Sequence, residues 1–464
     1  GDGTVSTVIL AGNILQEYKK LLEMNIHPLT IVDGCTMAAQ KSLHLLNKIA
    51  TKIDPLDPAM LRKIARTALV GVSPLEEHFA ALAVDAFMRV MHKTRKKCDV
   101  DIDHISIEKK AGGAPSESRV IDGVAFFKEI ADPRMPKRVV KARVAVLKGE
   151  LKIGKRGKTQ YEHKSLIERP SRMKEFQDVE KRLLEDIAGR LAELRVNVLV
   201  VEKGVDDRLL YHLSRSEILT LRRVVIEDLE RIAEAVGAKV VADPNDLSPA
   251  DLGAAKLVEE RKIAGEAWTF IEGCNDPKAV TILIRGGAVH TLNEAERSIK
   301  KALSALRSVI RNPRIVPGGG AAEAELARRL RRWSDHSAKR EQLAISSFAA
   351  ALESIPATLA ENAGLNVVDT LIELRSSHSR GQVTAGIGVQ SQAVKDMQEM
   401  GVYDPVLVKR QMVMSAYETA NVILRISDYF AAKMIEKPQY YEKKREEALK
   451  PEKVKKIKRE YGIE

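Results

Sequence analysis

The chain has 464 residues, of which 44% are hydrophobic and 30% charged, and its formal net charge is +12. A chain of this length holds enough apolar material for several hydrophobic cores, so we expect more than one domain. No apolar run approaches the roughly 20 residues of a membrane span, which argues against a membrane-spanning protein. The three cysteines, Cys35, Cys98 and Cys274, are widely spaced. This spacing argues against a disulfide framework or a cysteine metal site and fits a reducing cytoplasmic compartment.

The positive charge raises the hypothesis of nucleic-acid binding, because basic chains attract phosphate backbones. Near the C-terminus, however, "PEKVKKIKRE" mixes lysine and glutamate, which is typical of a solvated tail or a frayed helix. The basic segment "VLKGELKIGKRGKTQYEHK" contains a single aromatic residue, Tyr161, whereas proteins that bind single strands stack bases on several. A charged surface is the favoured interpretation of both segments, and RNA binding stays as an alternative.

Helices are predicted for the first hundred residues. One begins at Thr4, because apolar residues recur at spacings of three and four, at Val8, Ala11, Leu15, Tyr18 and Leu22. Two more are predicted over residues 37–50 and 76–91. The sequence therefore opens with an all-helical region.

The pattern changes near residue 103, where short β-branched runs begin to alternate with helical stretches. Strands are predicted at 143–148, 197–204, 238–243 and 279–287, and a helix at 175–194. This order is typical of an α/β unit. After Gly287 long helices return as far as Lys433. Helical ends around an α/β centre indicate one domain inserted within another, with both ends folding together.

Two glycine clusters are candidates for ligand contact. "GDGTVST" places Asp2 between two glycines at a helix start, where the helix dipole favours anions and a carboxylate can bind a hard metal ion. It thus has the outline of a phosphate and magnesium site, although a simple helix cap is the better interpretation when this stretch is taken alone. "IVPGGGAAEAELARRLRRW" precedes a helix that begins at Ala321, with Glu323 and Glu325 in its first turn. Three glycines there allow close approach of a ligand, as would also be seen in a flexible connector.

The order of the motifs is more specific than any one of them. The chain contains, in order, "GDGTVSTVILAGNIL", "MPKRV", "KGVDD", "DLSPADLG", "LVEERKI", "EGCNDPKAVTILIRGG", "NEAERSIKKAL", "IVPGGGAAEAELARRLRRW", "REQLAI", "LESIPATLAENAGLN" and "YDPVLVKRQ". From Gly1 to about Lys433 it resembles a subunit of the group II chaperonins, the archaeal thermosome and eukaryotic cytosolic chaperonin family, and the archaeal branch is the closer.

The resemblance implies a multidomain α and α/β fold. A mostly helical equatorial domain is expected at 1–56 and 313–437, an α+β intermediate domain at 57–125 and 276–312, and an α/β apical domain at 126–275. The apical domain is expected to bear a helical lid protrusion near 155–185, and residues 438–464 to form a basic tail. Because the chain begins inside a motif and without Met, we expect a natural N-terminal segment to precede Gly1.

The resemblance also implies a function. Subunits of this family form two stacked rings that enclose unfolded protein, and ATP binding and hydrolysis drive closure of the lid. The implied partners are paralogous subunits and unfolded client proteins, and the implied cofactors are ATP or ADP with Mg²⁺.

Site residues follow by position in the motifs. Asp2 matches the magnesium ligand, and Gly3, Thr4 and Ser6 match phosphate contacts, with Val5 where a hydroxylated residue is usual. At the other end of the chain, Gly318 and Gly319 match glycines beside the ribose and base, Asp404 matches the acid that holds the ribose hydroxyls, and Lys409 matches a lysine near the base.

Two departures bear on hydrolysis. In "ERSIKKAL", Lys301 stands where the family has the aspartate that orients the attacking water, so no intact catalytic residue is expected there. The family's sensor lysine, expected after "ARTAL", is also missing, since no lysine occurs between Lys63 and Lys93. We therefore predict a nucleotide-binding subunit with weak or absent hydrolysis that acts beside competent paralogues. The alternatives are a fully active ATPase that uses another carboxylate, and an RNA-binding or scaffolding protein on a chaperonin fold.

Overall fold

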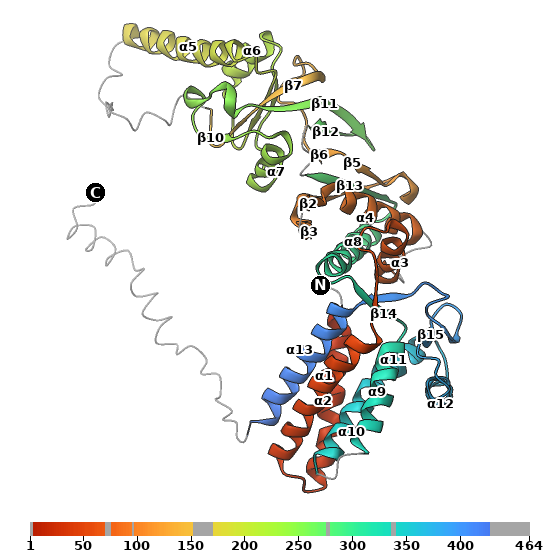
Figure 1. The fold of residues 1–464 in the computed structure, drawn as a ribbon. Helices are drawn as coiled ribbons and strands as arrows, with labels where there is room; N and C mark the ends of the chain where they lie inside the picture. Colours follow the sequence, from red (N-terminus) through yellow and green to blue (C-terminus); the bar gives the residue numbers. More distant parts are fainter. Residues whose placement is uncertain are drawn as a thin grey trace, which may run out of the picture.

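The computed structural model describes residues 3–69, 76–94, 97–151, 170–274, 279–335 and 340–426. Figure 1 shows an elongated molecule with a helical bundle at one end and a sheet with its helices at the other. In this described part of the chain, buried apolar residues form three large cores, one at each end and one between them.

Both ends of the chain build the helical bundle. It contains α1 (Thr4–Glu23), α2 (Pro28–Ile49), α9 (Ala321–Ser334), α10 (Glu341–Leu352) and α13 (Val406–Leu424), and α1 packs against α13 and α10. Helices α11 (Ser354–Asn362) and α12 (Val367–Ser379) lie beside this bundle. The first and last described segments therefore share one hydrophobic core.

The buried face of α1 differs from the predicted stripe. Its core residues are Leu10, Ala11, Ile14, Tyr18 and Leu21. Val8 is 72% exposed and Leu22 is 38% exposed, so these two positions of the predicted stripe are wrong. Apolar residues cover more than one face of α1, and contact with α13 and α10 determines which face is buried.

Short strands connect the bundle to the rest of the molecule. The strands β1 (Thr51–Lys52), β14 (Arg314–Pro317) and β17 (Tyr403–Pro405) form an antiparallel sheet in the order β1–β14–β17. A hairpin joins β15 (Ala385–Gly388) to β16 (Ala393–Asp396). The sequence analysis expected only helices in the first hundred residues and after Gly287. It missed these strands because two to four residues are too few to show an alternating pattern.

The middle core packs three helices on a small sheet. The helices are α3 (Pro58–Leu69), α4 (Glu76–Val90) and α8 (Val289–Arg311), and the sheet has the order β4 (Ile105–Ala111), β13 (Val280–Gly286) and β5 (Arg119–Ile121). Strand β13 is parallel to β4 and antiparallel to β5. A separate hairpin pairs β2 (His92–Thr94) with β3 (Lys97–Asp99).

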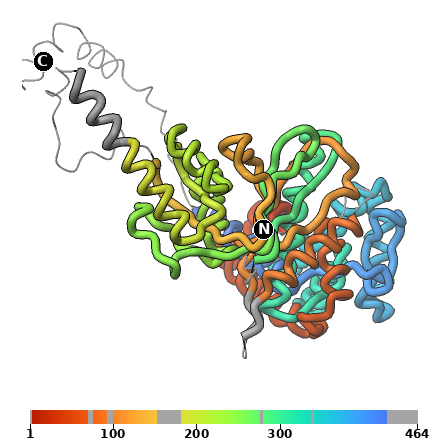
Figure 2. The backbone as a smooth tube through the Cα atoms, turned by 90° about the horizontal axis from the view of Figure 1, so that it is seen from above, coloured from red at the N-terminus to blue at the C-terminus, as the bar shows by residue number. Residues whose placement is uncertain are grey.

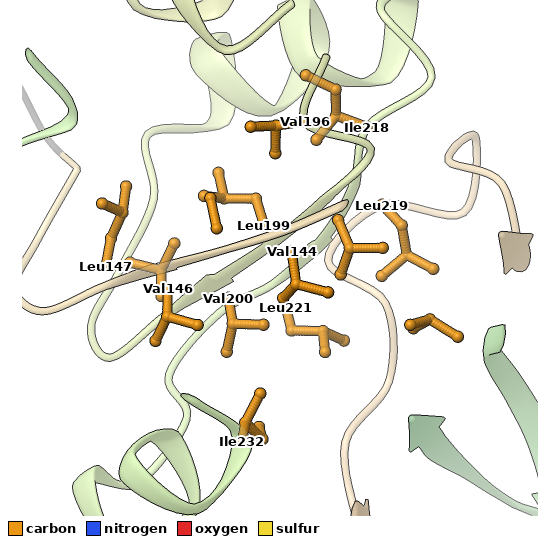
Figure 3. Packing of buried hydrophobic residues seen from close by; sticks show 14 of the residues in the cluster. Val144, Val146, Leu147, Val196, Leu199, Val200, Ile218, Leu219, Leu221 and Ile232 are labelled. Carbon is orange, nitrogen blue, oxygen red and sulfur yellow. The ribbon is translucent and has the colours of Figure 1, made fainter. Parts of the chain in front are cut away.

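The third core surrounds a seven-stranded mixed sheet. Its order is β6 (Gly123–Phe126), β12 (Glu266–Cys274), β11 (Gly253–Ile263), β7 (Arg138–Leu147), β8 (Val198–Val201) and β9 (Leu219–Leu221), and β10 (Val240–Val241) pairs with β7. Strands β7, β8 and β9 run parallel, and their Val and Leu side chains pack beside the sheet with Ile218 and Ile232 (Figure 3). Helices α5 (Pro170–Glu193), α6 (Asp207–Arg215) and α7 (Ile226–Val236) complete this region.

Helix α5 extends away from the body of the molecule (Figure 2). It includes the second half of the range predicted for the lid protrusion, 155–185, whereas residues 155–169 lie outside the described residues. The basic tail at 438–464 lies outside them as well.

Two further expectations concern membranes and cysteines. By length and composition alone, the stretch Glu341–Asn362 could cross a membrane, because an 18-residue window within it has a mean hydropathy of 1.4. The stretch comprises α10 and α11, and 56% of that window is buried inside the protein, as in a core helix. Cys35 and Cys274 are buried free thiols, and the side chain of Cys98 lies outside the described part.

Candidate functional site

A cavity of about 740 Å³ lies where the bundle meets the middle core. Its walls come from the N-terminus of α1, the ends of α3 and α4 that face each other, the turn before α9, and the junction of β17 with α13. The polar and glycine residues that line it include Gly3, Ser6, Arg66, Thr67, Glu76, Glu77, Gly319, Asp404 and Lys409. Apolar walls with a few convergent polar groups and a volume between about 300 and 1,000 Å³ are typical of small-molecule sites.

The N-terminus of α1 opens into this cavity. Gly3 is the residue before the first turn and has a left-handed backbone, with φ +80°, and a Cβ there would come within 2.9 Å of Val408. The first turn carries no acidic side chain, so the helix dipole and the first N–H groups favour an anion. Val5 and Ser6 line the cavity, whereas Thr4 is exposed and is not among the lining residues.

The triple glycine brings backbone to the cavity wall because side chains would not fit. Gly319 has φ +59°, and a Cβ at this position would lie 2.5 Å from the sulfur of Met397 and 2.9 Å from the carbonyl oxygen of Ile387. Gly319 lines the cavity. Gly318 lies behind it: its N–H donates to the carbonyl of Val402 at 3.0 Å, and it is not among the lining residues.

Asp404 is held in place by a buried ammonium group. The Nζ of Lys409 lies 2.8 Å from Oδ2 of Asp404 and 2.7 Å from Oε1 of Glu323, which is completely buried. Burial alone would lower the pKa of Lys409, but the two carboxylates outweigh it and raise that pKa above its ordinary value. Lys409 is therefore a fixed cation that orients Asp404 toward the cavity.

The opposite wall carries a second cation and two carboxylates. Arg66, in the last turn of α3, donates a hydrogen bond of 2.8 Å to the carbonyl of Met400. Its Nη1 lies 3.8 Å from Oε2 of Glu77, at the start of α4. Both residues line the cavity, as does Glu76.

Lys301 is not in this cavity. It lies on α8, is half-exposed, and is absent from the described lining. The same helix buries Ile299, Leu303, Leu306 and Ile310, and Lys301 lies off this buried stripe. Asp2 and the loop 70–75, where the sensor lysine would be found, lie outside the described residues. Within the described ranges, no group of three or more His, Cys, Asp or Glu residues could hold a metal ion.

Comparison with known proteins gives a consistent result. A family model described as "TCP-1/cpn60 chaperonin family" matches residues 1–434. The chain belongs to the TCP-1/cpn60 chaperonin family. It is 44% identical over 439 residues to thermosome subunit alpha of Archaeoglobus fulgidus, and 43% identical over 445 residues to a thermosome subunit of Pyrococcus abyssi. The matches cover 94% and 96% of this chain and 80% of each relative.

A solved structure supports the same group II fold. The open-state monomer of a group II chaperonin from Methanococcoides burtonii superposes with a TM-score of 0.68 at 34% identity. The match covers 92% of this chain and all of that one. The predicted resemblance and the multidomain α and α/β fold class are thereby confirmed.

The structure also brings in residues that the sequence analysis missed. Glu323 was noted only as a first-turn residue of a helix, yet it completes the ion pairs of Lys409. Arg66 and Glu77 belonged to helices with no motif of their own. The one available signal was "ARTAL", in which an arginine occurs near the end of a largely apolar helix, immediately before the loop that lacks the expected lysine.

Proposed function

We propose that this protein is a subunit of a double-ring chaperonin that binds ATP or ADP with Mg²⁺ in the cavity and hydrolyses ATP slowly or not at all. The N-terminus of α1 would hold the phosphates, the glycines before α9 would lie beside the ribose and base, and Asp404 would accept the ribose hydroxyls. Support comes from the cavity itself, which joins groups from opposite ends of the chain in a volume of about 740 Å³.

The proposed loss of hydrolysis rests on the lysine at position 301. A protonated lysine does not accept a proton from water, and hydrolysis of a phosphoanhydride needs a group that orients the attacking water. Loss of one positioned catalytic group commonly lowers a rate by about a hundredfold or more. Competent paralogues in a mixed ring would then supply the hydrolysis, and Archaeoglobus fulgidus does have both alpha and beta thermosome subunits among the relatives of this chain.

The three-domain division is part of the same proposal. The bundle core, the middle core and the sheet core support an equatorial domain at 1–56 and 313–437, an intermediate domain at 57–125 and 276–312, and an apical domain at 126–275. Cytoplasmic localisation and binding of unfolded clients belong to the proposal through the family alone.

A fully active ATPase is the second candidate, and one observation favours it. Glu76 and Glu77 line the cavity from α4, so a carboxylate is present that could orient water in place of the missing aspartate. RNA binding has no comparable support, because the basic tail lies outside the described residues.

Hydrolysis per bound nucleotide separates the two candidates. The full-length subunit should bind ATP but release little phosphate, and Lys301→Asp should raise turnover by at least about tenfold. Lys300→Asp is a matched control, because it makes the same charge change at the neighbouring exposed position, where Lys300 pairs with Glu296. Rapid turnover by the wild type that falls in Glu76→Gln or Glu77→Gln would instead show an active enzyme.

A further inference from the structure

Arg66 is a cation of the cavity that uses little of its hydrogen-bonding capacity within the described residues. A guanidinium has five N–H donors in a planar fork. One nitrogen of Arg66 donates to the carbonyl of Met400, and the ion pair with Glu77 is long, at 3.8 Å. The Arg66 side chain is 39% exposed and that of Glu77 is 74% exposed, so solvent weakens their attraction.

Lys409, the other cation of the described lining, is already paired with carboxylates. Arg66 and Lys409 are the two basic residues among the described residues that line the cavity. Lys409 has carboxylates within 2.8 Å on two sides, and it is buried. A phosphate group that entered the cavity would therefore find an available positive side chain at Arg66.

The position of Arg66 is fixed by its helix and by a hydrogen bond at the next residue. It lies in the last turn of α3, and the hydroxyl of the next residue, Thr67, accepts a hydrogen bond of 3.2 Å from the N–H of Tyr403. Tyr403 precedes Asp404 in β17. The end of α3 is thus attached to the strand that carries the proposed ribose contact, and Arg66 lies one residue before the attachment point.

We propose that Arg66 is the phosphate-binding cation of this cavity and pairs with the terminal phosphate of ATP, exchanging Glu77 for the nucleotide. This inference rests on the proposed function, namely that the cavity binds nucleotide. A planar guanidinium binds phosphate oxygens through two parallel hydrogen bonds, which compensates for the lysine that is missing between Lys63 and Lys93. Glu77 is then a competing anion that weakens binding of the triphosphate.

The test is calorimetric titration of the full-length chain with MgADP and with a non-hydrolysable Mg·ATP analogue. Arg66→Gln should raise the Kd of the analogue by about tenfold to a hundredfold, the effect of losing hydrogen bonds to a charged group, and change the Kd of ADP by less than about threefold. Arg62→Gln is the matched control, because it makes the same substitution one turn earlier at an exposed position outside the described lining. It should leave both affinities unchanged.

Glu77→Gln provides an independent arm, needed if thermal unfolding shows that Arg66→Gln does not fold. Loss of the competing carboxylate should tighten analogue binding by about twofold or more and leave ADP binding unchanged. Equal effects on both nucleotides, or none in either variant, would overturn the role of Arg66 while nucleotide binding stands. Absence of binding to either nucleotide by the wild type would overturn the proposed function, and the role of Arg66 with it.

Discussion

Removal of the Lys409 ammonium should loosen the junction between α9 and α13. In Lys409→Met the carboxylates of Glu323 and Asp404 lose the cation that lies within 2.8 Å of each. Glu323 is completely buried, so water does not replace the lost partner. Deleting one member of a buried ion pair commonly destabilises a protein by about 3–5 kcal/mol, since a buried charge stays uncompensated.

The measurement should be local, because a chain with several cores does not unfold in a single step. Amide hydrogen exchange in α9 and α13 reports the free energy of local opening. A loss of about 3–5 kcal/mol corresponds to exchange that is faster by about a hundredfold to several thousandfold. Exchange in the sheet core around β7 and β8 should not change, since that core is separate.

Two variants test the reasoning. Arg410→Met removes a neighbouring cation that is exposed, and it should change the opening free energy by less than about 0.5 kcal/mol. Adding Glu323→Gln to Lys409→Met removes one of the two orphaned charges and should recover part of the loss. Exchange in Lys409→Met as slow as in Arg410→Met would refute the claim that Lys409 is structurally required.

Two further predictions concern other parts of the bundle. Burial raises the pKa of Glu325, but its hydrogen bonds with His378, Arg328 and a second arginine outweigh burial and lower it to about 2. A depressed carboxyl pKa stabilises the fold above the unfolded value near 4.5, so the local stability of the bundle should fall by about 3 kcal/mol as pH drops from about 4.5 to about 2. Glu325→Gln should flatten that decline, as measured by amide hydrogen exchange in α9. Gly319→Ala should abolish detectable nucleotide binding in calorimetry, because its φ of +59° and crowded Cβ position exclude a side chain. Gly12→Ala should instead stabilise α1 by about 0.5–1 kcal/mol, because no atom lies within 4 Å of a Cβ added at Gly12.

The sequence predicted long elements and ordered motifs better than short strands and ion pairs. Apolar periodicity located α1 and α4, and the order of the motifs identified the family. Contacts between distant segments have no local signature, so the pairing of Glu323 with Lys409 was not predictable from either motif. The choice of buried face on α1 was missed for the same reason, because packing against α13 decides it.

The candidate site shows a similar division. Motif matching placed Gly3, Ser6, Gly319 and Asp404 together, and the structure brings all four to one cavity. Their role in nucleotide binding stays a prediction. Thr4 and Gly318 match the motif equally well but do not line the cavity. The order of the motifs does not show which way a side chain points or how close a backbone segment lies to the cavity.

In the proposed arrangement, the groups that would bind the nucleotide are different from the residue position that would support hydrolysis. The phosphate and ribose contacts of the cavity, as proposed, come from the bundle, whereas Arg66 and Glu77 come from α3 and α4. These helices share the middle core with α8, the helix that carries Lys301. A nucleotide that touches both Asp404 and Arg66 would hold the bundle and the middle core together without any chemical step. If position 301 carries the catalytic group in relatives, as proposed, lysine there would remove that group and leave these ligand contacts in place. A subunit of this kind would respond to ATP in a ring and leave the timing of hydrolysis to its neighbours.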